Sequence, residues 1–87
     1  MTEPPPLTAV VDIARAMELG VTATEARHLQ QIASGWTQRE IAAVDWLQPN
    51  SVNTRVWRLR LRLELRTTEQ LIAWAYENHV LEVKRRG

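Results

Sequence analysis

Five arginines lie close together between residues 55 and 66, at positions 55, 58, 60, 62 and 66, with Glu64 as the only acid among them. Guanidinium groups bind phosphate oxygens and guanine edges, while Asn, Ser and Thr side chains pair with base edges or phosphates. Just before the arginines come Asn50, Ser51, Asn53 and Thr54. The segment therefore carries the side-chain chemistry of duplex DNA recognition.

A helix over residues 49–63 would sort these side chains onto separate faces. At 100° per residue, Val52, Val56, Leu59 and Leu63 share one stripe and form the predicted core face. Arg55 and Arg62 lie on one flank, and Asn53 and Arg60 lie on the other. The face opposite the core carries Asn50, Ser51, Thr54, Trp57, Arg58 and Leu61.

A short helix is predicted directly before the basic one. Thr37 and Glu40 have capping-box spacing, so a helix begins near Gln38 and runs about two turns. Pro49 forces the preceding residue out of the helical region and suits the first turn of a new helix, with Gln48, or as a weaker alternative Leu47, as its N-cap. A short helix, a tight turn and a basic helix form the pattern of a helix-turn-helix, whose second helix enters the major groove.

Two groups of DNA contacts are predicted from this arrangement. The flanking Arg55 and Arg62 would bind phosphates, as would the amides near Thr37 and Gln38. The base readers would be Asn50, Ser51, Asn53, Thr54, Trp57 and Arg58. The alternative is that the arginines form only the solvated face of an amphipathic helix.

Composition limits the other functional classes. The chain has 87 residues, 45% of them hydrophobic, which suits one small domain. It has no cysteine, three glycines, and two histidines far apart in sequence, His28 and His79. We expect no catalytic site, no metal and no cofactor, with His28 an exposed or half-buried helix residue. The net charge of +1 does not by itself indicate nucleic-acid binding.

The predicted fold class is all-α, because every other element expected in the chain is a helix and none is a strand. Residues 1–6 form a Pro-rich extended lead before the first helix. Residues 7–20 form an amphipathic helix that ends at Gly20. Its predicted buried face carries Leu7, Val10, Ala14 and Met17, with Ile13 beside them.

Two further helices have clear start signals. Thr22 and Glu25 form a second capping box, opening a helix that runs to Ser34 before Gly35. Thr67 or Thr68 caps a helix to about Asn78, and a basic tail over residues 82–87 contains Lys84, Arg85 and Arg86. No apolar run approaches a membrane span and no export signal precedes the domain, so we expect a cytoplasmic protein.

From residue 21 to 81 the chain resembles the LuxR-type (GerE-like) DNA-binding domain of bacterial transcription regulators. The matching stretches are VTATEARHLQQIASGWTQREIA at 21–42, SVNTRVWRL at 51–59, and Leu63 together with TEQLIAWA at 68–75. The resemblance implies a compact four-helix domain with helices near 23–34, 38–44, 49–63 and 68–78. It also implies that the third helix reads DNA and that the fourth commonly forms the dimer contact.

Several residues depart from the family pattern. Asn53 stands where a Lys is usual, Arg55 where a His is usual, and Trp57 at a position that is often polar or basic. Asp45 replaces a typical Leu, whose core place we expect Trp46 to take. Glu64 replaces a Gly that commonly ends the reading helix, so we expect that helix to continue into residues 65–67.

The leading hypothesis is a dimeric transcription regulator that binds duplex DNA on a two-fold site. Residues 7–20 would cap the domain's own core. Alternatively this segment, through Val10 and Met17, or the helix that carries Trp74 and Tyr76 would form a dimer or partner interface. A second hypothesis is an adaptor that holds RNA polymerase or another regulator through Trp57, Leu61 and Trp46. A third is a mobile-element repressor or recombination accessory factor.

Overall fold

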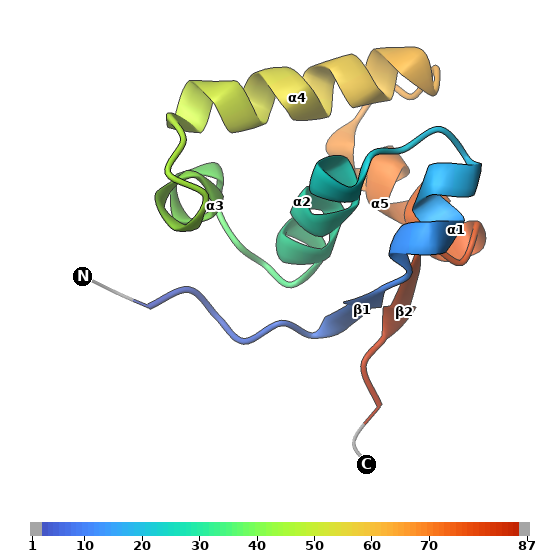
Figure 1. Cartoon of the computed structure of the whole chain (residues 1–87), viewed down its shortest axis with the longest axis horizontal. Coiled ribbons are helices and arrows are strands. Elements are labelled where there is room, and N and C mark those ends of the chain that lie inside the picture. The colour runs from blue at the N-terminus through green and yellow to red at the C-terminus, as the bar shows by residue number, and fades with distance from the viewer. Residues whose placement is uncertain (1–2, 86–87) are drawn as a thin grey trace.

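The computed structural model describes residues 3–85 and is mostly helical, with one small sheet (Figure 1). The four helices of the predicted DNA-binding domain lie where they were expected, to within one residue. The two strands contradict the all-α prediction. In chain order the elements are β1 (Ala9–Val11), α1 (Ile13–Glu18), α2 (Ala23–Ala33), α3 (Gln38–Val44), α4 (Pro49–Arg62), α5 (Thr68–Glu77) and β2 (Leu81–Val83).

The helix starts follow the predicted caps. In the capping box of α2, the Thr22 amide donates to Glu25 Oε1 at 2.9 Å and the Glu25 amide donates to Thr22 Oγ1 at 3.1 Å. The same reciprocal pair forms at α3, and Thr67 caps α5 with Gln70 as its partner. Helix α4 begins at Pro49 after Gln48, as predicted, without a side-chain cap.

All five helices end in the same way. The residue after each C-cap has a positive φ, and the amide of the next residue donates back to a carbonyl in the last turn, as in the Schellman motif. At α4 this left-handed residue is Glu64, with φ of 58°, and the Leu65 amide donates to the Arg60 carbonyl at 2.8 Å. Helix α4 therefore ends at Arg62, and the expected continuation into residues 65–67 is wrong.

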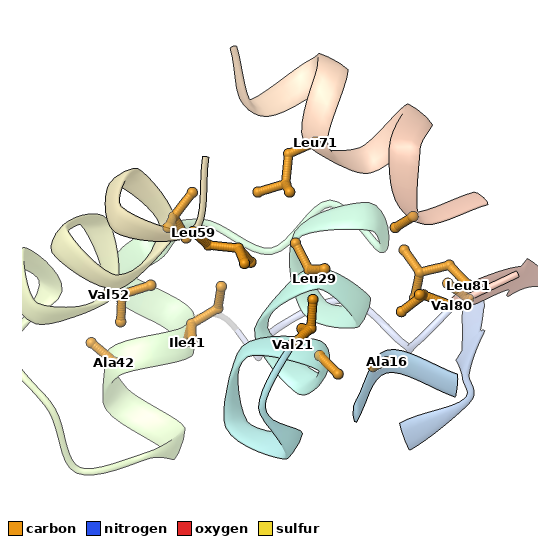
Figure 2. Packing of buried hydrophobic residues seen from close by; sticks show 14 residues of the cluster. Ala16, Val21, Leu29, Ile41, Ala42, Val52, Leu59, Leu71, Val80 and Leu81 are labelled. Carbon is orange, nitrogen blue, oxygen red and sulfur yellow. The ribbon is translucent and has the colours of Figure 1, made fainter. Parts of the chain in front are cut away.

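The core is built around α2. Figure 2 shows Leu29 between Ile41, Val52 and Leu59 on one side and Val80 and Leu81 on the other, and all six side chains are at most 2% exposed. Leu71 and Ala75 of α5 join the same cluster. One apolar core is therefore shared by α2, α3, α4 and α5. Helix α4 faces this core with the side that the sequence predicted to be buried.

The N-terminal segment differs from the predicted helix over residues 7–20. Only Ile13–Glu18 is helical, and residues 9–11 form a strand. Ala16 and Ala9 are buried, whereas the predicted inner face of Leu7, Val10, Ala14 and Met17 is exposed. The face was wrong because pairing of Ala9–Val11 with Leu81–Val83 replaces the first helical turns, and Asp12 caps α1 by accepting from the Arg15 amide.

Both ends of the described chain are tied to the domain. Strands β1 and β2 are antiparallel, with Val10 opposite Glu82. Before β1, the Pro5 carbonyl accepts from Trp36 Nε1 at 2.7 Å, and the Thr8 amide donates to Ser34 Oγ at 2.9 Å. Residues 82 and 83, predicted as the start of the basic tail, are therefore part of the fold, in strand β2. Residues 1 and 2 of the predicted lead, and Arg86 with residue 87 of the predicted tail, lie outside the described residues.

Candidate nucleic-acid interface

Helix α4 is held in place by its apolar stripe and by the helix before it. Val52, Val56 and Leu59 are buried, and Leu63 packs half-buried against the same core. In Figure 1, α4 runs along one edge of the molecule, with α3 seen nearly end-on beneath its N-terminal end. Gln38 Nε2 of α3 donates to Asn53 Oδ1 of α4 at 3.0 Å. The side chains on the outer face of α4 therefore project from a fixed support.

The predicted base readers form one outward surface on α4. Asn50, Asn53, Trp57 and Arg58 are exposed, while Ser51 and Thr54 are half-buried. Thr54 Oγ1 donates to the Asn50 carbonyl at 2.9 Å, so its remaining capacity is as an acceptor. The structure thus gathers the six predicted side chains on the accessible part of a single helix.

Two hollows adjoin this surface and share Arg55 and Arg58. The first, of about 560 Å³, lies at the start of α4. The second, of about 320 Å³, lies between α4 and the start of α2. Neither guanidinium is in an ion pair within residues 3–85. The first hollow is lined by Gln48, Asn50, Ser51, Thr54, Arg55 and Arg58, and the second by Thr22, Thr24, Glu25, Arg55, Arg58 and Arg62.

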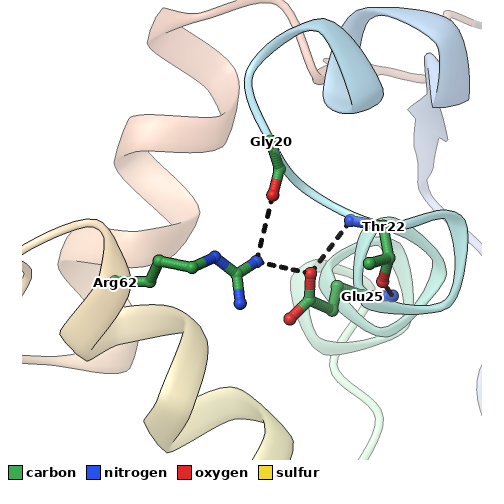
Figure 3. A network of polar contacts seen from close by, with 4 residues as sticks. All are labelled: Gly20, Thr22, Glu25 and Arg62. Atoms are coloured by element: carbon green, nitrogen blue, oxygen red, sulfur yellow. Dashed lines mark hydrogen bonds and ion pairs between the residues drawn. The ribbon is translucent and has the colours of Figure 1, made fainter.

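Arg62 is exposed but is engaged in contacts within the protein. Its Nη2 lies 2.6 Å from Glu25 Oε1 and donates to the Gly20 carbonyl at 3.1 Å (Figure 3). Burial alone would raise the pKa of the Glu25 carboxyl, but hydrogen bonds from Arg62 and Thr22, with the Arg62 charge, lower that pKa below its ordinary value of about 4.5. Arg62 therefore joins α4 to α2 instead of presenting a free charge to a phosphate.

The other arginines also divide by role. Arg60 is half-buried, and its Nη1 donates to the Arg66 carbonyl. This hydrogen bond ties the segment that follows α4 to the helix. Arg55 and Arg58 are the exposed pair beside the outer face. Of the five arginines between residues 55 and 66, these two lie beside the outer face of α4 and form no ion pair within residues 3–85.

The start of α3 is already occupied by its own cap. The Thr37 amide donates to Glu40 Oε1 at 2.8 Å, and the Thr37 hydroxyl accepts from the Glu40 amide at 3.2 Å. This capping box also places the Glu40 carboxylate at the start of α3, where it would repel an approaching phosphate. Thr37 is thus used structurally, and Gln38 reaches α4 with its side chain.

His28 and Trp46 are placed differently from their predictions. His28 is only 2% exposed, and its Nε2 lies 2.9 Å from Asp45 Oδ2, at the end of α3. Asp45, found where a Leu is typical of the resembled family, thus holds a buried imidazole. Trp46 is 95% exposed, so it does not take the core place expected for it. Its left-handed backbone at the end of α3 turns the side chain outward.

The predicted dimer or partner residues fall into two groups. Trp74 and Tyr76 are half-buried and pack against the core, whereas Val10 and Met17 are 49% and 61% exposed. Within residues 3–85, no group of three potential metal ligands occurs and no helix is long and apolar enough to cross a membrane.

Two side-chain pairs in this region were missed by reasoning from the sequence: Glu25 with Arg62, and His28 with Asp45. The members of the first pair are 37 residues apart and those of the second are 17 apart, on elements whose relative rotation no local spacing specifies. Comparison of the chain with protein-family models, with curated proteins and with solved structures finds no match.

Proposed function

We propose that this protein binds double-stranded DNA sequence-specifically, with α4 in the major groove, and acts as a dimeric transcription regulator of the LuxR type. The proposal rests on one observation above all. The outer face of α4 presents Asn, Ser and Thr side chains on a helix that is fixed from behind, together with Arg55 and Arg58, which form no ion pair in the described part of the chain. A major groove about 12 Å wide admits one helix with such side chains.

The contacts are assigned by position. Asn50, Asn53 and Arg58 would meet base edges, with Ser51 and Thr54 near the start of the helix as shorter-range partners. Arg55 and Gln38 would bind phosphates on the flanks. Arg62 and Thr37 are left out of the contact set, because an ion pair and a capping box already use them.

The family assignment is supported by residues and by element positions. The motifs at 21–42 and 51–59 form a capped helix, a short helix and an exposed helix in the expected order. The strand pair and α1 are additions that pack on the end of the domain away from α4 (Figure 1). The dimer contact is proposed by this likeness alone, with Trp74 and Tyr76 on the helix concerned.

The test compares two double variants, each of which removes two positive charges from the protein. Arg55→Ala/Arg58→Ala removes the two exposed arginines of α4 that form no ion pair within residues 3–85, whereas Lys84→Ala/Arg85→Ala removes two exposed charges near the strand pair. Fluorescence anisotropy with a 30-base-pair mixed-sequence duplex at low salt measures affinity. We expect the α4 variant to lose at least tenfold, since each contact is worth about 1–3 kcal/mol, and the control to lose little. Equal losses, or no binding by the native protein, would refute the proposal.

A further inference from the structure

The outer face of α4 contains an apolar pair among its polar side chains. Trp57 is 50% exposed and Leu61 is 56% exposed. Four residues apart on one helix, they are neighbours on the same face. Arg58 stands beside them, and Asn53 and Thr54 lie one turn earlier. Leaving two large apolar side chains in water is unfavourable. Their position on the proposed reading face therefore suggests that a bound partner covers them.

The size and surroundings of this pair favour a DNA groove over a protein partner. A stable protein interface buries about 1,200–2,000 Å² in total, far more than two side chains supply. The pair lies on a helix at one edge of the molecule (Figure 1), between charged and amide side chains. A helix at the edge of the molecule, flanked by Arg55 and Arg58 without ion-pair partners among residues 3–85, is complementary to an anionic groove.

The floor of the major groove offers one apolar group, the 5-methyl of thymine, while the other exposed base edges are hydrogen-bond donors and acceptors. We propose that Trp57 and Leu61 read thymine methyl groups, so that the target site holds thymines opposite the middle of α4. This inference rests on the proposed DNA binding and names a chemical feature of the site.

The experiment begins with selection of duplexes from a random pool by the native full-length chain. The selected site is then synthesised with deoxyuridine in place of each thymidine, which removes only the 5-methyl group. Affinities for both duplexes are measured for the native protein, for Trp57→Ala/Leu61→Ala, and for Val83→Ala. Val83 is a 69% exposed apolar residue of β2 and serves as the control.

The native protein and Val83→Ala are expected to lose about fourfold in affinity for each contacted methyl group that is removed, because the burial of that methyl group is lost. Trp57→Ala/Leu61→Ala is expected to bind the thymidine site more weakly and to treat both duplexes alike. Because both side chains are exposed, the variant keeps the core.

Three outcomes would overturn the inference. If the native protein binds the thymidine and deoxyuridine sites equally, the apolar pair does not read methyl groups, and a protein-binding role for it is favoured. If the double variant still distinguishes the two duplexes, other residues read the methyl groups. If selection recovers no sequence and no duplex is bound at low salt, the proposed function itself fails, and the inference fails with it.

Discussion

At the scale of single residues, the arginines between residues 55 and 66 make different contacts. Arg62 is paired with Glu25, Arg60 bonds the backbone at Arg66, and Arg55 and Arg58 are left beside the outer face. The total of five in the sequence therefore overstates the charge available to a phosphate backbone. The salt dependence of DNA binding should reflect the smaller number, since each phosphate neutralised contributes to the slope.

The Glu25–Arg62 pair predicts a pH dependence of stability. Because the folded state lowers the pKa of Glu25, the pair stabilises fully above the unfolded value and its contribution is lost as the pH falls through the lower folded pKa. Gln at position 25 keeps the capping-box acceptor and removes the charge. Glu25→Gln should therefore cost about 0.5–1 kcal/mol at pH 7, with the difference closing below about pH 4.

Urea unfolding at pH 7 and pH 3 measures this effect. Glu69→Gln, an exposed acid in the first turn of α5 with no ion pair in the described chain, is the matched control and should change less. A Glu25→Gln deficit that stays the same at pH 3 would show that the loss is not electrostatic.

Residue-level prediction from the sequence succeeded where the signal was local. The stripe of Val52, Val56 and Leu59 is buried as the helical period required. It failed for His28, which is buried against Asp45, because a polar pair between two helices leaves no periodic trace in either. The predicted core position of Trp46 was wrong for a related reason. The direction of its side chain depends on a left-handed backbone conformation that no local pattern indicates.

At the scale of elements, the left-handed residue at each helix end shapes the domain. Two of the five positions are Gly20 and Gly35, but Trp46, Glu64 and His79 adopt the same conformation with side chains. For an L-residue this conformation costs about 1–2 kcal/mol. Helix starts were predictable because a capping box is recognised from its residue types. The left-handed residues at these three ends were not predicted, since no glycine marks them.

Glu64→Gly tests the cost of this backbone conformation. The substitution should raise the free energy of unfolding by about 1 kcal/mol, because glycine adopts a positive φ without strain. Gly35→Ala is the converse control. Its φ is +90° and a methyl group there would meet nothing within 4 Å, so any loss reflects the backbone alone. Thermal unfolding measures both, and a Glu64→Gly variant no more stable than the native protein would contradict the assignment.

At the scale of the whole molecule, the strand pair joins the two ends of the described chain beside the core. Leu81 is 1% exposed, and its strand partner Val11 packs half-buried against the core. The pairing joins residues some 70 positions apart, a contact between distant segments that local periodicity does not reveal. This is why residues 7–20 were predicted as one helix and residues 82–87 as a tail.

A pair of truncations in β2 tests whether this strand is part of the core. Leu81→Ala should lower the free energy of unfolding by about 2–5 kcal/mol, the usual cost of cutting a buried leucine to alanine. Val83→Ala, in the same strand but 69% exposed, should change it by less than about 0.5 kcal/mol. Urea titrations measure both, and similar small effects would place the C-terminal strand outside the cooperative unit.

The measurement that tests the central claim most directly is the affinity of the native chain for duplex DNA as a function of salt. If α4 lies in the major groove with Arg55 on a phosphate, the affinity should fall as salt rises, with a log–log slope of about −1 or steeper. One neutralised phosphate contributes about −0.9, and further phosphate contacts add to this. The Arg55→Ala/Arg58→Ala slope should be shallower. Absence of binding at low salt, or an affinity that salt does not change, would contradict DNA recognition by this helix.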